Sequence, residues 1–150
     1  MSALSANSRG FSLIDMMITL GIVGALVGIA IPSYNSYVSM AQTGVVRDHY
    51  ERARHTVRLS YAKAQMRQAT GHQISLPQTS AEWISEINQN GALSPEGGPA
   101  YVDATGTVNP GQIGIEASGT FPTTAIVVIT QPSYRNMTAR QVTVAAIDAL

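Results

Sequence analysis

Residues 11–34, FSLIDMMITLGIVGALVGIAIPSY, decide how this chain is organised. From Phe11 to Ile31 the sequence carries a single charge, Asp15, among residues that are otherwise apolar, small or hydroxyl-bearing. About 20 apolar residues in a helix cross the hydrocarbon core of a bilayer, so this run predicts a membrane-spanning helix. A carboxylate near the middle of such a helix costs about 2.5–3.5 kcal/mol, and we therefore expect Asp15 to be a functional group with a partner.

Two ordinary explanations of an N-terminal apolar run fit poorly. A secretory signal has an apolar core of about 7–15 residues followed closely by a small-residue cleavage site. The run is longer than that, and the small residues of SMA, at 39–41, lie well beyond its end. A plain membrane anchor has the right length, but it explains neither Asp15 nor the polar segment that ends at Gly10.

The spacing of five residues resembles that of a known family. The apolar run begins at the junction Gly10-Phe11, and Asp15 is the fifth residue after that junction. Gly24 is the fourteenth residue and Pro32 is the twenty-second. This pattern closely resembles the amino terminus of type IV pilins and of their relatives, the pseudopilins of type II secretion. The resemblance covers roughly the first 40 residues.

The resemblance implies processing and a role for the acid. In that family a prepilin peptidase cuts after the glycine, and the new first residue is then N-methylated, which implies cleavage between Gly10 and Phe11 and methylation of Phe11. The family's acid, usually Glu, is thought to pair with a terminal amine during assembly. The amine here would belong to a neighbouring subunit or to the same chain, where Phe11 lies about 6 Å from Asp15 along a helix. The other interpretation is that Asp15 only sits near a helix start, where the helix dipole favours acids.

Glycine and proline positions in the run carry two further expectations. Gly21, Gly24 and Gly28 include a GxxxG pattern, which allows helices to approach closely in an apolar medium, although glycine is also common in membrane helices. Pro32 removes a backbone hydrogen bond, so it predicts a kink or a local loss of helix between Gly28 and Pro32.

After Pro32 the pattern predicts that one long helix continues. Apolar residues recur every three or four positions on one face, which is typical of a helix packed on a core: Val46, Tyr50, Ala53, Val57, Tyr61 and Ala64. A weaker stripe on nearly the opposite side, Leu59, Ala62, Met66 and Ala69, fits either a neighbouring subunit or plain surface. Gly71 is a stop signal. A helix from Phe11 to Ala69 would be about 90 Å long, more than a small domain can bury.

The remaining sequence predicts a short helix and a small sheet. Thr79 and Glu82 form a capping box ahead of a helix that buries Trp83, Ile84 and Ile87 and ends at Gly91. Strands are expected at 100–103, 112–117, 124–130 and 141–147. The fold class is therefore α+β: the type IV pilin fold, a long N-terminal helix packed on a three- or four-stranded antiparallel sheet. The expected segments are a leader at 1–10, a transmembrane and polymerisation helix at 11–32, its amphipathic half at 33–70, a connecting region at 71–99 and a head domain at 100–150.

The composition points away from catalysis. The chain has nine basic and nine acidic residues and no cysteine, and its three histidines, His49, His55 and His72, are expected at the surface. No clustered nucleophile and base and no phosphate loop occur, so we expect no enzyme activity, no cofactor and no metal. Four acids are the candidates for a calcium site, although DATGTVNPG lacks the acid spacing of a calcium loop: Glu96, Asp103, Glu116 and Asp148.

The expected function is that of a structural subunit of a type IV pilus, polymerised through its N-terminal helix for adhesion, motility or DNA uptake. The alternative is a pseudopilin of a type II secretion system. The expected partners are other copies and other pilins, the prepilin peptidase, the inner-membrane assembly platform and, before assembly, membrane lipid. Arg47, Arg54 and Arg58 form a basic edge, which we expect to pack near acidic sheet domains of neighbouring subunits; nucleic acid is the alternative partner for this edge. The precursor is expected in a bacterial inner membrane, with its N-terminus cytoplasmic, and the product in an extracellular pilus, or in a periplasmic filament if it is a pseudopilin.

Overall fold

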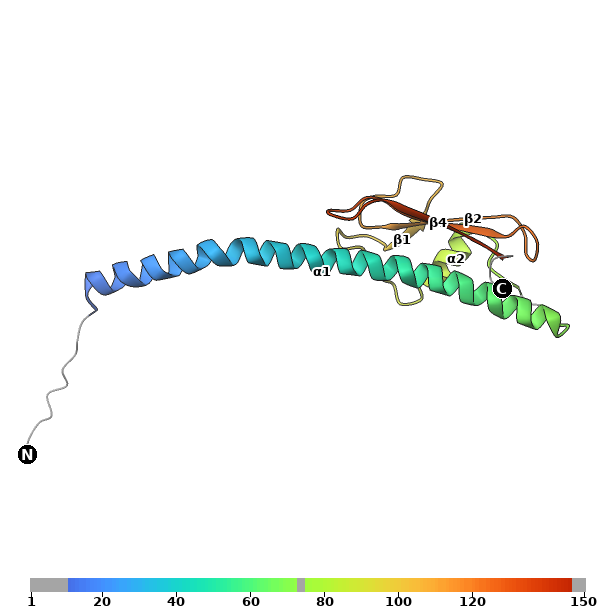
Figure 1. Ribbon diagram of the computed structural model, residues 1–150, viewed down its shortest axis with the longest axis horizontal. Coiled ribbons are helices and arrows are strands. Elements are labelled where there is room, and N and C mark those ends of the chain that lie inside the picture. The colour runs from blue at the N-terminus through green and yellow to red at the C-terminus, as the bar shows by residue number, and fades with distance from the viewer. Residues whose placement is uncertain (1–10, 73–74, 147–150) are drawn as a thin grey trace, which may run out of the picture. The chain divides into compact units, whose positions relative to one another are not determined.

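The computed structural model describes residues 11–72 and 75–146 and divides the chain into two compact units. The first unit ends at Val38 and the second begins at Ser39. The helix α1, Leu13–Ala69, contributes residues to both units (Figure 1). The expected leader at 1–10, including Gly10, lies outside the described residues, and so do Ile147 and Asp148.

The described part of the first unit is an apolar helix with no covering. Every residue from Phe11 to Tyr37 is exposed. By its length and apolar composition, α1 could cross a membrane, and none of its most apolar 18 residues is buried. Pro32 lies inside α1, which stays helical across it. The local loss of helix expected between Gly28 and Pro32 is therefore not found, and the kink at Pro32 stays a prediction.

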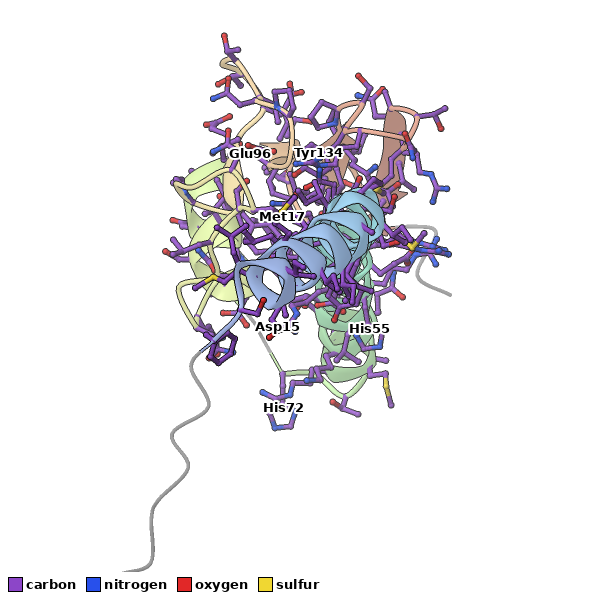
Figure 2. The ribbon with its side chains drawn as sticks, turned by 90° about the vertical axis from the view of Figure 1, so that its left-hand side faces the viewer. Asp15, Met17, His55, His72, Glu96 and Tyr134 are labelled. Atoms are coloured by element: carbon purple, nitrogen blue, oxygen red, sulfur yellow. The ribbon has the colours of Figure 1, made fainter. Side chains whose placement is uncertain are left out.

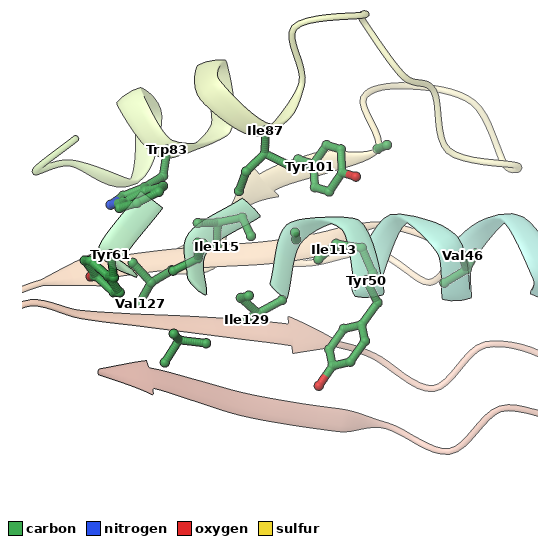
Figure 3. Close-up of a cluster of buried hydrophobic side chains, with 14 of the residues drawn as sticks. Val46, Tyr50, Tyr61, Trp83, Ile87, Tyr101, Ile113, Ile115, Val127 and Ile129 are labelled. Atoms are coloured by element: carbon green, nitrogen blue, oxygen red, sulfur yellow. The ribbon is translucent and has the colours of Figure 1, made fainter. Parts of the chain in front are cut away.

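The second unit has its core where α1 packs on a sheet. All six residues of the predicted stripe are buried, with Val46, Ala53 and Val57 fully inaccessible. They pack against aliphatic and aromatic side chains from the strands and from the second helix (Figure 3). The expected amphipathic packing of this half of α1 is confirmed.

The short helix α2, Ser80–Ile87, forms because its first turn is capped from both sides. The Thr79 hydroxyl accepts a hydrogen bond from the Glu82 N–H, and the Glu82 carboxylate accepts one from the Thr79 N–H, as the capping box predicts. Trp83 and Ile87 are buried, and Ile84 is partly buried against the core. Trp83 packs edge-on against Tyr61, with ring centroids 5.6 Å apart.

The sheet has four strands in the order β1-β2-β3-β4: Tyr101–Asp103, Ile113–Ser118, Ile126–Gln131 and Arg140–Ala145. β2, β3 and β4 pair antiparallel, as expected, but β1 pairs parallel to β2. The sheet is therefore mixed, and the expectation of an entirely antiparallel sheet was wrong. The reason is that residues 104–112 carry the chain from the end of β1 back to the level of its first residue: Ile113 pairs with Tyr101, so β2 runs in the same direction as β1. The α+β class is confirmed.

Candidate assembly site

The first turn of α1 explains where the Asp15 carboxylate points. Its Oδ2 atom accepts a hydrogen bond from the Ser12 N–H at 3.3 Å, and the Ser12 hydroxyl accepts one from the Ile14 N–H at 3.4 Å. The Ser12 carbonyl accepts the first backbone bonds of the helix. Ser12 and Asp15 thus form a reciprocal cap at the start of α1, where Figure 2 labels Asp15.

This cap gives a specific geometry to the second interpretation of Asp15, in which the carboxylate sits near the start of a helix. The signal was present in the sequence as the spacing Ser-x-x-Asp, the same spacing that predicted the cap of α2. The cap turns the carboxylate toward the N-terminal end of its own helix, next to the Phe11–Ser12 peptide. Any amine released at Phe11 would be one residue away from the N–H that Asp15 already binds.

Gly21, Gly24 and Gly28 lie on one face of the exposed part of α1. A Cβ atom added at any of the three would meet no atom within 4 Å. Their positions in the described chain therefore leave a flat, unoccupied strip of helix. Such a strip allows close approach of another helix in an apolar medium.

The basic edge of α1 is only partly neutralised within the chain. Arg54 pairs with Glu51 at 3.2 Å, and both side chains are partly exposed, so the pair contributes little to stability. Arg47 and Arg58 are exposed and make no ion pair with any residue that the structure describes. A positive strip is left along this side of the helix.

His49 is buried, and the expectation of a surface histidine was wrong there. Its position on α1 lies at the flank of the buried stripe, and its ring packs against the Tyr101 ring with centroids 5.6 Å apart. The Tyr101 hydroxyl donates to the His49 carbonyl oxygen at 3.1 Å, while the His49 Nδ1 atom is buried without a partner in the described part of the chain. Burial lowers the pKa of His49; Asp48 opposes this effect and Arg52 adds to it.

A polar cluster joins two loops of the second unit that sequence reasoning did not connect. The Tyr134 hydroxyl donates to the Glu96 carboxylate at 2.8 Å and accepts from the Arg135 Nε–H at 3.2 Å (Figure 2). Arg135 also lies 3.6 Å from Glu96 and adopts a positive φ of 50°. No signal in the sequence paired Glu96 with Tyr134, because they are 38 positions apart. Glu96 is thus committed to an ion pair, and no group of three His, Asp or Glu residues in 11–72 and 75–146 is placed to hold a metal.

Comparison with known proteins places the N-terminal segment. It is 49% identical over 35 residues to Fimbrial protein Q of Moraxella bovis, covering 23% of this chain and 22% of that protein. A type IV major alpha-pilin of the same organism gives the same identity over the same length. The type IV major fimbrial protein FimA of Dichelobacter nodosus is 47% identical over 39 residues, which cover 26% of this chain and 24% of that protein.

These matches confirm the resemblance of the N-terminal segment to type IV pilins. The names are those of pilins and fimbrial proteins rather than of enzymes. The chain spans only about a quarter of the length of the curated relatives it matches. No family model and no solved structure matches the chain.

Proposed function

We propose that this chain is a structural subunit of a type IV pilus, without enzymatic activity, that polymerises through the first half of α1. The observation that carries the proposal is an apolar helix that no described residue covers, in a segment nearly half identical to major pilins. Among the described residues, 15 large apolar side chains between Phe11 and Tyr37 are exposed, and such a surface belongs in a membrane or against other copies.

The processing steps follow from the same segment. Removal of residues 1–10 by a prepilin peptidase would leave Phe11 as the first residue, to be N-methylated. The new amine would be a cation beside Asp15, its own or that of a neighbour. Charge neutralisation would then favour entry of this end into an apolar filament core. Gly21, Gly24 and Gly28 would supply the contact strip between helices, and Pro32 the site of a bend.

The proposed location changes with assembly. The precursor would lie in the inner membrane with the leader cytoplasmic and the second unit periplasmic, in contact with lipid and with the assembly platform. Assembly would move it into an extracellular filament with other pilins. Adhesion, motility and DNA uptake are the functions that we propose for such a filament.

A pseudopilin of type II secretion is the second candidate. The same N-terminal features would serve a short periplasmic filament, and the absence of cysteine departs from the disulfide found in many major pilins. The relatives that match are named as major pilins and fimbrial proteins, which favours the pilus.

The processing step has a direct test. Gly10→Val should block leader removal, because in the family that the segment resembles the cut follows a glycine, and the cell membrane should then hold only the longer precursor. Asn7→Val, in the same leader, is the matched control and should be processed normally. Normal processing and normal surface filaments in Gly10→Val would overturn the proposal.

A further inference from the structure

A groove in the second unit gathers arginine side chains at the β4 side of the sheet. It has a volume of about 390 Å³ and lies between the start of this unit's helix, 40–47, and the loop 136–140 that leads into β4. Arg47 and Arg140 line it, both exposed, and Met40 and Met137 supply apolar contact. No carboxylate is among its described lining residues, and neither arginine pairs with a described acid.

The positive charge extends one turn further along α1. Tyr50 is buried, and the burial raises its pKa, while Arg54 and Arg140 both act to lower it. Positive charge from two elements, α1 and β4, therefore acts on the Tyr50 hydroxyl, and Figure 3 shows the Tyr50 side chain directed toward the β4 side of the sheet. Glu51 is the acid nearby, and it is already paired with Arg54. The excess charge at this edge is positive.

The opposite edge of the same unit carries acids. The strand order places β1 and β4 at the two ends of the sheet, and α2 packs on β1 and β2 (Figure 3). Three exposed carboxylates lie there: Glu82 and Glu86 on α2, and Asp103 at the end of β1. Lys63 and Arg67 line a depression beside Glu86 and offset part of this charge.

The carboxylates at this edge have oxygen atoms that are still able to accept hydrogen bonds from a partner. Glu82 and Asp103 accept local hydrogen bonds through one oxygen each, Oε2 and Oδ1, so each has a second oxygen outside those contacts. The Glu86 carboxylate makes no hydrogen bond or ion pair with the described residues. The second unit thus presents a positive edge and a negative edge at opposite ends of one sheet.

We propose that the groove lined by Arg47 and Arg140 receives the α2–β1 edge of a second copy of this chain. The inference rests on the proposed function and names one contact within that filament. Two different, complementary edges on one unit make a head-to-tail contact, which repeats without closing when the rotation between copies does not close a ring. Complementary charges at the edges fix the register and suppress other pairings.

A second copy fits the groove better than a polyanion does. The chain carries equal numbers of acidic and basic residues, so each copy brings the acids that its own basic edge lacks. Met40 and Met137 offer apolar area beside the arginines, which is typical of a contact between proteins and of little use to a phosphate backbone.

A charge-swap experiment in the full-length protein tests this contact. Arg140→Glu should lower the yield of sheared filaments several-fold at an unchanged cellular level of processed subunit. Adding Glu86→Lys should restore most of the yield. The matched control adds Glu116→Lys instead, which has the same net charge but places the lysine on the outer face of β2, where it should restore nothing. Resistance of each variant to limited proteolysis shows that the second unit is folded.

The outcomes separate the contact from the proposed function. Wild-type filament yield in folded Arg140→Glu overturns the contact and leaves the pilus proposal standing, and so does equal rescue by Glu86→Lys and Glu116→Lys. If Arg140→Glu filaments form normally but lose binding to duplex DNA, the groove belongs to a polyanion and the contact is overturned. Absence of wild-type filaments from every cell fraction would instead remove the pilus proposal itself.

Discussion

The Asp15 carboxylate has one role that the described chain shows, the cap of α1, and one that we propose, an ion pair in assembly. In the described chain it accepts the Ser12 N–H and so helps to start α1. A cap needs a hydrogen-bond acceptor, whereas an ion pair needs a charge. The two roles therefore separate on substitution.

We predict that both Asp15→Asn and Asp15→Ala insert and are processed normally but assemble poorly. Asparagine keeps an acceptor for the Ser12 N–H and loses the charge, so only the ion pair is removed. Asp15→Glu should be tolerated, because Glu is the usual partner in a capping box. Sheared filament yield measures the effect, and wild-type yield from Asp15→Asn would show that the cap alone is required.

His49 should make the second unit less stable in mild acid. Its folded-state pKa lies below the ordinary value of 6.5, so the unfolded chain binds the proton more readily. The contribution of neutral, buried His49 to the free energy of unfolding is present above pH 6.5, and it is lost as the pH falls below 6.5 toward the folded-state pKa. Urea unfolding of the wild type and of His49→Gln from pH 7.5 to 4.5 should show a steeper acid loss in the wild type. Exposed His55→Gln is the control, and parallel curves for wild type and His49→Gln would contradict this account.

Gln131 should be replaceable with a gain in stability. Its side chain is fully inaccessible, and neither its Oε1 nor its Nε2 atom has a hydrogen-bond partner in the described structure. Removing a buried, unpartnered amide gains about 1–3 kcal/mol, so Gln131→Met should raise the free energy of unfolding by that order. Gln112→Met is the matched control, because its amide binds Pro99 and Asn109 and its loss should destabilise. A loss of stability in Gln131→Met would show that the amide has a partner after all.

At the scale of elements, the sequence predicted what depends on local pattern. The buried stripe of α1, the capping box of α2 and the four strand positions followed from periodicity and from turn residues. The parallel pairing of β1 with β2 did not, because pairing direction depends on how the loop at 104–112 folds back. The Arg47–Arg140 groove and the Glu96–Tyr134 contact join residues far apart in sequence, and no local pattern carries that information.

The turn between β2 and β3 gives a test of backbone geometry. Gly119 has a φ of 78°, and a Cβ there would lie 1.8 Å from the Thr124 carbonyl oxygen. Gly119→Ala should therefore cost more than the approximately 1–2 kcal/mol of the left-handed conformation alone. Gly71→Ala, with a φ of 77° and no atom within 4 Å of the added Cβ, should cost only that amount. Thermal unfolding of both variants measures the difference in their loss of stability. Equal losses would contradict the close approach of residue 119 to the Thr124 carbonyl oxygen.

At the scale of the whole molecule, the chain joins an uncovered apolar helix to a small unit with its own core. The second unit contains the packed sheet. In the first unit every residue from Phe11 to Tyr37 is exposed, and Val38 is only partly buried. In the proposed function, a membrane surrounds the first unit of the single chain before assembly. In the proposed filament, the apolar helices of other copies take the place of that membrane.

The proposal that this chain is a pilus subunit is tested most directly by filaments sheared from the cell surface. The measurement is the mass and the first residue of the dominant protein in those filaments. A subunit of a type IV pilus should appear there as a chain beginning at N-methylated Phe11, without residues 1–10. A chain that still carries its leader, or that is found only in the cell envelope when surface filaments are abundant, would contradict the account.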